Sequence, residues 1–299
     1  MKLKLSLKNS AKSGLFLNLL LILSLVSGCS TSTAPTFTLD KITTSIEDIC
    51  KKEYGMNVSS RMVGETLWVY LPLNNILGKK DPPTKATDIF EVTDLTEEFR
   101  DKTFRLEYSV KSIPPKETLD DSEITKDASD KISNLWKVIR RIIFSLEHAK
   151  NSEPKFYCVV AADIKKGFEI KLVVYYLDLK KVSYGLISSE EYQHRTIQDI
   201  NIDPAIIGDR RGAYLQYRDI SLEEFIANQI INRIKLKFQK PEVTKHADIE
   251  KEILKIVVTV FNIYKFEGFE NVELEGKEQQ LKILFNKAAI QEKAKEYGF

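Results

Sequence analysis

Histidine and cysteine are scarce in this chain of 299 residues, which contains three of each. No H-E-x-x-H motif or closely spaced cysteine pair is present to bring two ligands to one metal ion. Glycine-rich phosphate-binding loops and the G-x-S-x-G nucleophile elbow are missing as well. The sequence therefore predicts no metal site, no cofactor and no catalytic residues, although a triad whose members meet only in space stays open. The three histidines are His148, His194 and His246.

Long apolar runs are also rare. Past residue 28 the sequence holds no run long enough to cross a bilayer. The run from Leu15 to Val26 is shorter than the roughly 20 residues that a transmembrane helix needs. Four lysines precede this run, and a basic start followed by a short apolar core is typical of a secretory signal peptide. These lysines are Lys2, Lys4, Lys8 and Lys12.

Val26, Ser27, Gly28 and Cys29 end the apolar run. This stretch resembles the lipobox of bacterial lipoproteins, which lipoprotein signal peptidase recognises and cleaves just before the cysteine. The resemblance implies a signal peptide over residues 1–28 and a lipid on Cys29 that holds the protein to a membrane. A serine follows the cysteine, and under the Gram-negative sorting rule this favours the outer membrane over the cell membrane. The alternatives are an ordinary signal peptide, or an N-terminal transmembrane anchor with an incidental cysteine.

Cleavage would reverse the sign of the net charge. The full chain carries 45 basic and 43 acidic residues, for a net charge of +2, and residues 1–28 contribute four lysines and no acid. The mature chain would keep 41 basic and 43 acidic residues, for a net charge of −2. We therefore expect no nucleic-acid partner. The lipobox, the several small α+β units described below and the lack of a catalytic motif favour an envelope protein as partner, met at a membrane face toward the periplasm or the exterior.

Three segments have apolar residues at helical spacing, and each is followed by two β-rich runs separated by a turn. The helices are expected around Ile46, Ile139 and Ile256. We predict an α+β fold of several helix-plus-hairpin units, whose antiparallel sheets carry helices on one face. Because the three helices are irregularly spaced along the chain, duplication of one unit stays an open alternative. The hairpins are expected over residues 58–73, 156–177 and 272–285.

Composition divides the mature chain into a tether and three units. Residues 30–36 are small and polar, which predicts a flexible lipidated tether over residues 29–38. Pro114-Pro115 and the acidic residues after them predict a boundary near residue 118. The α+β units are expected at residues 39–118, 119–240 and 241–299.

Several smaller elements are expected inside these units. We predict a short helix near residues 94–102, a strand over 182–187 and a long irregular segment over 197–218. Ser188 and Ser221 each precede a glutamate by three residues, which is the capping-box pattern of a helix start.

Two side-chain pairs are candidates for recognition. Arg210 and Arg211 lie in the long irregular segment, where their guanidinium groups could bind a carboxylate, a phosphate or a partner. Solvated arginines or internal ion pairs are the alternative. Trp68 and Tyr70 share one face of a predicted strand and could bind a sugar or a partner, although packing under a helix is the favoured interpretation.

Cys50 and Cys158 could form a disulfide in an oxidising periplasm. Two separate buried thiols, one in a helix and one in a strand, are the favoured alternative. The sequence thus predicts a lipid-anchored cell-envelope protein with a non-catalytic binding or assembly role. An envelope hydrolase with a dispersed active site and a carrier of lipids or small molecules are the alternatives.

Overall fold

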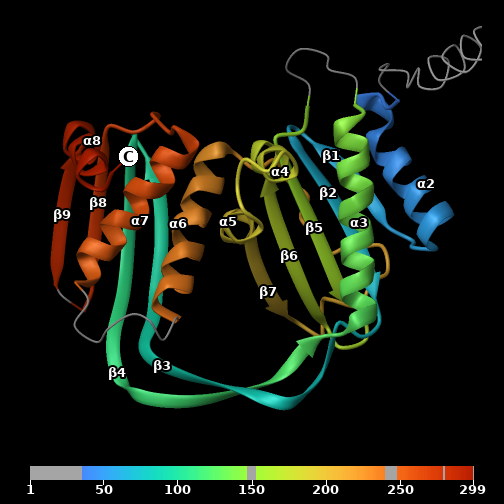
Figure 1. Ribbon diagram of the computed structural model, residues 1–299, viewed down its shortest axis with the longest axis horizontal. Coiled ribbons are helices and arrows are strands. Elements are labelled where there is room, and N and C mark those ends of the chain that lie inside the picture. The colour runs from blue at the N-terminus through green and yellow to red at the C-terminus, as the bar shows by residue number, and fades with distance from the viewer. Residues whose placement is uncertain (1–35, 147–152, 240–247, 279, 299) are drawn as a thin grey trace, which may run out of the picture.

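Two separate β-sheets organise the chain (Figure 1). The computed structural model describes residues 36–146, 153–239, 248–278 and 280–298. Strands β1, β2, β5, β6 and β7 form a five-stranded sheet in that order, and β3, β4, β8 and β9 form a four-stranded sheet. Each sheet with its helices makes one lobe, which we call the five-stranded lobe and the four-stranded lobe. The predicted α+β class is confirmed.

The five-stranded lobe is built on β5 (Phe156–Asp163), whose eight residues are all buried. Strand β5 runs parallel to β2 (Thr66–Leu73) and antiparallel to β6 (Phe168–Tyr175). Uninterrupted apolar residues suit such a central strand, because both of its faces are covered. The remaining strands of this sheet are β1 (Ser59–Val63) and β7 (Ile197–Ile202).

Two helices cover one face of this sheet. Helix α2 (Ile42–Tyr54), which follows the short 3-10 turn η1 (Leu39–Lys41), buries Ile42, Ile46 and Cys50 at four-residue spacing. Helix α3 (Lys126–Phe144) packs beside it with a longer apolar stripe. Such stripes place the buried apolar side chains of each helix on the face that meets the sheet.

The other face of the five-stranded sheet is covered by residues 203–221, a succession of turns. Trp68 and Tyr70 of β2 are buried beneath these turns rather than beneath a helix. Tyr217 and Tyr214 pack edge-on against the two rings. The indole of Trp68 donates to the Arg218 carbonyl oxygen at 2.8 Å, so the polar atom of this buried ring is satisfied.

The four-stranded lobe places three helices against its sheet. Helices α6 (Leu222–Gln239) and α7 (Ile249–Tyr264) cover one face, and the terminal helix α8 (Lys287–Glu296) packs against α7 and β9. Strand β4 pairs in parallel with β8, which returns antiparallel to β9. The four strands are β3 (Leu77–Arg100), β4 (Thr103–Ile124), β8 (Asn271–Gly276) and β9 (Leu281–Asn286).

The opposite face of the four-stranded sheet is charged and open to solvent. Arg105 pairs with Glu98 and Glu273, and Lys282 pairs with Glu273 and Glu275. Cross-strand pairs of this kind are expected on a solvated sheet face.

Strands β3 and β4 form a hairpin that belongs to both lobes (Figure 1). The half near the turn, around Phe90 and Phe104, enters the core of the four-stranded lobe. The other half continues as a two-stranded ribbon to the start of α3 in the five-stranded lobe (Figure 1). The prediction of a helix over residues 94–102 is wrong, because these residues form the end of β3 and the hairpin turn.

The boundary predicted near residue 118 lies inside β4. Pro114-Pro115 does not end the strand, because it lies where the pairing register shifts between Asp88 and Phe90. Prolines are tolerated at such irregularities, where no ladder hydrogen bond is needed from their nitrogens. The expected unit 39–118 is therefore divided between the two sheets, and the boundary at 240–241 lies outside the described residues.

The prediction of a strand over 182–187 is also wrong. These residues end α4 (Tyr176–Ser183) and form a turn, and the added strand is β7, inside the segment expected to be irregular. Both predicted capping serines are confirmed: Ser188 accepts from the Glu191 amide before α5 (Ser189–Arg195), and Ser221 accepts from the Glu224 amide before α6.

The three predicted helix-plus-hairpin units are present as α2-β1-β2, α3-β5-β6 and α7-β8-β9. However, the sheets are mixed rather than antiparallel, because hairpins meet in parallel at β2–β5 and at β4–β8. Each sheet therefore consists of two hairpins joined edge to edge, with a further edge strand, β7, in one of them. Joining two hairpins in this way satisfies one exposed strand edge of each.

Candidate functional site

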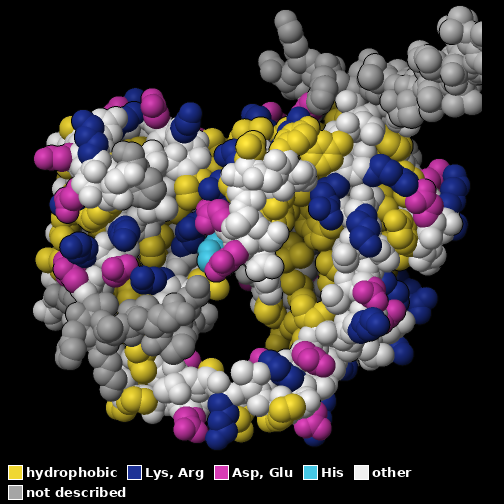
Figure 2. Space-filling view, viewed as in Figure 1, with side chains coloured by type: hydrophobic (Ala, Val, Ile, Leu, Met, Phe, Trp, Pro, Cys, Tyr) yellow, Lys and Arg dark blue, Asp and Glu magenta, His cyan; other side chains and the backbone are white. Residues whose placement is uncertain are grey.

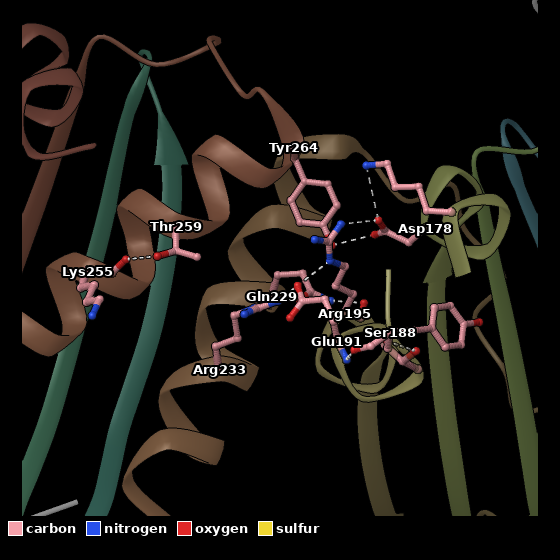
Figure 3. A network of polar contacts seen from close by, with 12 residues as sticks. Asp178, Ser188, Glu191, Arg195, Gln229, Arg233, Lys255, Thr259 and Tyr264 are labelled. Carbon is pink, nitrogen blue, oxygen red and sulfur yellow. Dashed lines mark hydrogen bonds and ion pairs between the residues drawn. The ribbon is translucent and has the colours of Figure 1, made fainter. Parts of the chain in front are cut away.

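A buried ionic network joins the two lobes (Figure 3). Asp178 of α4 is 1% exposed, and its carboxylate accepts from the Arg195 guanidinium of α5 at 2.9 Å and from the Tyr264 hydroxyl of α7 at 2.9 Å. Glu191 of α5 accepts from Arg195 at 2.6 Å and from Arg233 of α6 at 3.2 Å. The network thus connects α4 and α5 of the five-stranded lobe with α6 and α7 of the four-stranded lobe.

The acidic and basic side chains of this network are paired with one another. Burial acts to raise the pKa of Glu191, but the hydrogen bond from Arg195 and the charges of Arg233 and Arg195 outweigh it and hold the pKa below its usual range. Gln229 of α6 also donates to the backbone carbonyl of Arg195. Such a network requires defined geometry, because a misplaced partner would leave a charge buried and unpaired. We infer that it sets the relative position of the lobes.

Apolar packing completes this joint. Phe225, at the start of α6, is fully buried against the five-stranded lobe, with ring centroids 5.1 Å from Phe156 and 5.8 Å from Tyr175. The ring of Tyr264 lies 5.4 Å from Phe225, so this tyrosine belongs to both the apolar and the ionic parts.

A polar cleft of about 470 Å³ lies between the lobes. Its walls come from β6, β7, the turns before α6, and α6 itself, and Leu95 of β3 closes one side. Lys171 pairs with Asp199 at 3.3 Å, and Arg218 pairs with Glu224. The polar groups of the cleft are thus held largely by one another.

Glu169 is the most buried acid of this cleft. It accepts from the Tyr214 hydroxyl at 2.5 Å, and burial together with this hydrogen bond raises the pKa of Tyr214. A hydrolase would need a reacting group beside this pair. Cys158 is not such a group, because it is buried in the core and burial raises the pKa of its thiol.

An apolar groove of about 450 Å³ runs along the five-stranded lobe between α3 and α5. Its floor is β6, which presents Ile170, Leu172 and Val174 on the face that also carries α2 and α3. Ile132 and Trp136 of α3 form one wall. The opposite wall comes from α4 and α5 through Leu179, Val182 and Tyr192.

The floor of the groove continues onto β7. Ile200 and Ile202 alternate with Asp199 and Asn201, so they lie on the face of β6 that lines the groove, opposite Ile170 and Phe168. Both isoleucines are more than half exposed. Figure 2 shows the resulting apolar wall beside the opening between the lobes. We call this surface, from Trp136 to Ile202, the β6–β7 groove.

Spacing explains why this floor is open. Strands lie about 4.8 Å apart and packed helices 8–10 Å apart, so one helix covers about two strands. Two helices, α2 and α3, therefore cannot cover five strands. The short helices α4 and α5 lie only at one end of β6 and β7 (Figure 1). On β6, Ile170 and Val174 are buried and Leu172 is partly buried, whereas Ile200 and Ile202 of β7 are more than half exposed.

Arg210 and Arg211, the predicted contact residues, are exposed on a turn away from this groove. The Asp209 carboxylate accepts from the backbone amides of Arg211 and Ala213, which shapes the turn. These backbone bonds lower the pKa of Asp209. Arg210 lines a separate hollow beside Leu73, and neither guanidinium reaches the cleft or the groove.

Cys50 and Cys158 are free buried thiols on opposite faces of the five-stranded sheet. The favoured interpretation of two separate thiols is confirmed. Burial raises the pKa of Cys50 to about 11, which keeps its thiol protonated at neutral pH.

The lipobox residues Val26, Ser27, Gly28 and Cys29 lie outside the described residues, as do His148 and His246. Within the described part of the chain, no group of three or more histidine, cysteine or acidic side chains could hold a metal ion. No helix in that part is both long and apolar enough to cross a membrane.

Sequence reasoning missed both the groove and the ionic network. The exposed Ile200 and Ile202 lay in a segment expected to be irregular, where their alternation with polar residues was the available signal. Asp178, Arg195 and Tyr264 are too far apart in the chain for any local pattern to join them. No protein-family model, curated protein or solved structure matches this chain.

Proposed function

We propose that this is a lipid-anchored cell-envelope protein that binds another envelope protein without catalysing a reaction. The anchor is the lipid on Cys29 that the lipobox implies. The single observation that supports the binding role is the apolar β6–β7 groove, whose floor continues onto the exposed Ile200 and Ile202. Exposed, contiguous apolar surface of this kind marks interaction sites in soluble domains.

The partner that fits this groove is an amphipathic helix. Helices α2 and α3 already pack on the same sheet face, and the groove runs beside α3, so a further helix would pack there in the same way. Polar side chains edge the apolar floor, among them Ser133, Arg140 and Gln198. An apolar helix face would meet the floor while its polar face stays in water, as in other helix-in-groove complexes.

Site-specific photo-crosslinking in cells tests the groove. A photoreactive residue at Ser133, on the groove rim, is expected to give a discrete protein adduct. The same residue at Gln216, in the cleft, or at Lys282, on the open sheet face, is expected to give none. Equal adducts at all three positions, or none at Ser133, would contradict a groove partner.

A charge in the floor should remove this adduct. Ile200→Glu with Ile202→Glu leaves the fold intact because both side chains are already exposed. Burying their carboxylates under a partner would cost at least about 1.4 kcal/mol, so the Ser133 adduct should fall by about tenfold or more. Leu284→Glu is the matched control, because Leu284 is a similarly exposed residue on the other lobe.

The alternatives give different results. A hydrolase in the cleft would show turnover by the purified protein that is lost in Glu169→Gln. A carrier would retain lipid through purification, and native mass spectrometry would detect the bound molecule. Turnover or bound lipid, observed without a Ser133 adduct, would contradict the proposed groove partner and support the corresponding alternative.

Replacing Cys29 tests the anchor. Cys29→Ala is expected to abolish acylation, measured by mass spectrometry, and to move the protein out of the detergent phase on phase partitioning. A variant that still partitions like the parent would show that the lipid is not on Cys29. Cys50→Ala is the control, because that thiol is buried in the core and should not affect partitioning.

A further inference from the structure

Four exposed apolar side chains gather at one end of the five-stranded lobe. Leu177 and Tyr184 lie seven residues apart, which is two helical turns, so they share the outer face of α4. Phe144 ends α3 and its ring packs against Tyr184 with centroids 5.7 Å apart. Leu186 follows in the turn after α4, where its amide bonds to the Lys181 carbonyl.

These four side chains, which we call the α4 patch, are between 37% and 73% exposed. Figure 2 shows apolar side chains over α4 at that end of the lobe. No packing within the described structure explains them, because the core of this lobe lies on the other side of α4. Single exposed apolar residues are ordinary, but here four lie on or beside one short helix, and two of them are in ring contact.

The described chain begins at this same end. The amides of Thr36 and Phe37 both donate to the Ser145 carbonyl, at 2.9 and 3.1 Å, and Phe37 forms a parallel bridge with Leu146. Ser145 directly follows Phe144 of the patch. Any chain that leads from Cys29 therefore reaches the body one residue away from the patch.

Chain length limits how far this end can be from the lipid. Cys29 and Thr36 are seven residues apart, so the connection spans at most about 25 Å when fully extended. A lipid on Cys29 would hold Thr36 within that distance of the bilayer surface, and Thr36 bonds to Ser145, the neighbour of Phe144 in the patch. Tethering raises the effective concentration of the membrane at the patch, so a weak affinity becomes sufficient.

We propose that the α4 patch rests on the lipid bilayer and orients the body on the membrane. This inference rests on the lipid anchor of the proposed function. Phe144 and Tyr184 are side chains that suit a membrane interface, since their rings are apolar and tyrosine keeps a polar hydroxyl.

A fluorescent label on Leu186→Cys tests the contact in the full-length, processed protein. Cys50 and Cys158 are buried and would not compete for the label. The protein is reconstituted into vesicles of phosphatidylethanolamine and phosphatidylglycerol that carry nitroxide lipids. We expect a blue shift and quenching, strongest with the nitroxide near the headgroup, because interfacial side chains penetrate only about 5–10 Å.

Leu284→Cys is the matched control, since Leu284 is 62% exposed on β9 of the other lobe. Its label should show neither shift nor quenching. Leu177→Glu with Tyr184→Glu should remove the quenching at position 186, while Leu119→Glu, on the exposed ribbon, should leave it unchanged.

The mass of the same preparation shows whether the protein is acylated. This separates the lipid-anchor hypothesis from the membrane-contact hypothesis. An acylated protein whose label at 186 is not quenched, or is quenched no more than at 284, overturns the membrane contact and leaves the anchor standing. A protein without acylation overturns both. Quenching at 186 alone in an acylated protein supports the contact.

Discussion

Replacing Arg195 by methionine is expected to lower the free energy of unfolding by about 3–5 kcal/mol, which is the usual cost of removing one partner from a buried ion pair. The variant would leave the Asp178 carboxylate, which is 1% exposed, with only the Tyr264 hydroxyl and Lys181, whose ammonium is 3.9 Å away. Glu191 would lose its closest donor at the same time. Urea unfolding at pH 7, followed by tryptophan fluorescence, measures the loss.

A surface ion pair provides the control. Lys52→Met removes the pair with Asp48, whose side chains are largely exposed, and should change stability by less than about 1 kcal/mol. If Arg195→Met had an equally small effect, the buried network would contribute little to the stability of the fold.

The effect of Arg195→Met should also depend on pH. The pKa of Glu191 is lowered in the folded protein, so its contribution is complete above the unfolded value of about 4.3 and is lost as the pH falls through the lower folded value. The difference between Arg195→Met and the parent should therefore shrink in acid. An unchanged difference at about pH 3 would show that Glu191 contributes little.

Replacing Phe225 by alanine is expected to cost about 3–5 kcal/mol, because a fully buried phenylalanine leaves both lost transfer energy and a cavity. Phe225 belongs to α6 of the four-stranded lobe but packs among Phe156 and Tyr175 of the five-stranded lobe. The cavity would therefore open at the joint. Hydrogen exchange at the start of α6 should accelerate together with the loss seen in urea unfolding.

Phe144→Ala is the matched control for this variant. Phe144 is 37% exposed, so its removal should cost less than about 1.5 kcal/mol. A similarly small loss for Phe225→Ala would mean that α6 is not anchored at this point. Because Tyr264 contacts both Phe225 and Asp178, combining Phe225→Ala with Arg195→Met should give a non-additive loss of at least about 0.5 kcal/mol.

Local sequence patterns were sufficient to predict the helices and strands of the repeated units. The helical spacing of Ile42, Ile46 and Cys50 and the alternation around Trp68 predicted α2, β1 and β2 correctly. The two capping serines predicted the starts of α5 and α6. These signals depend on neighbours within a few residues, so the sequence displays them directly.

The long β3–β4 hairpin is the element that local sequence patterns predicted least well. Pro114-Pro115 and the charged residues of 94–102 are typical of loops and helix surfaces, yet β3 and β4 continue through them. A two-stranded ribbon with solvent on both sides selects neither apolar alternation nor the absence of proline. For the same reason, the sequence could not predict that this ribbon links the two lobes.

The sequence by itself determined the α+β class, the three helix-plus-hairpin units and the resemblance of residues 26–29 to a lipobox. Each of these depends on residue types at short spacing. Only the tertiary structure decided that the hairpins join in parallel pairs, that Ile200 and Ile202 of β7 are exposed beside the groove, and that Phe144 of the α4 patch lies beside Ser145. These features depend on contacts between residues far apart in the chain, for which a single sequence carries no local signal.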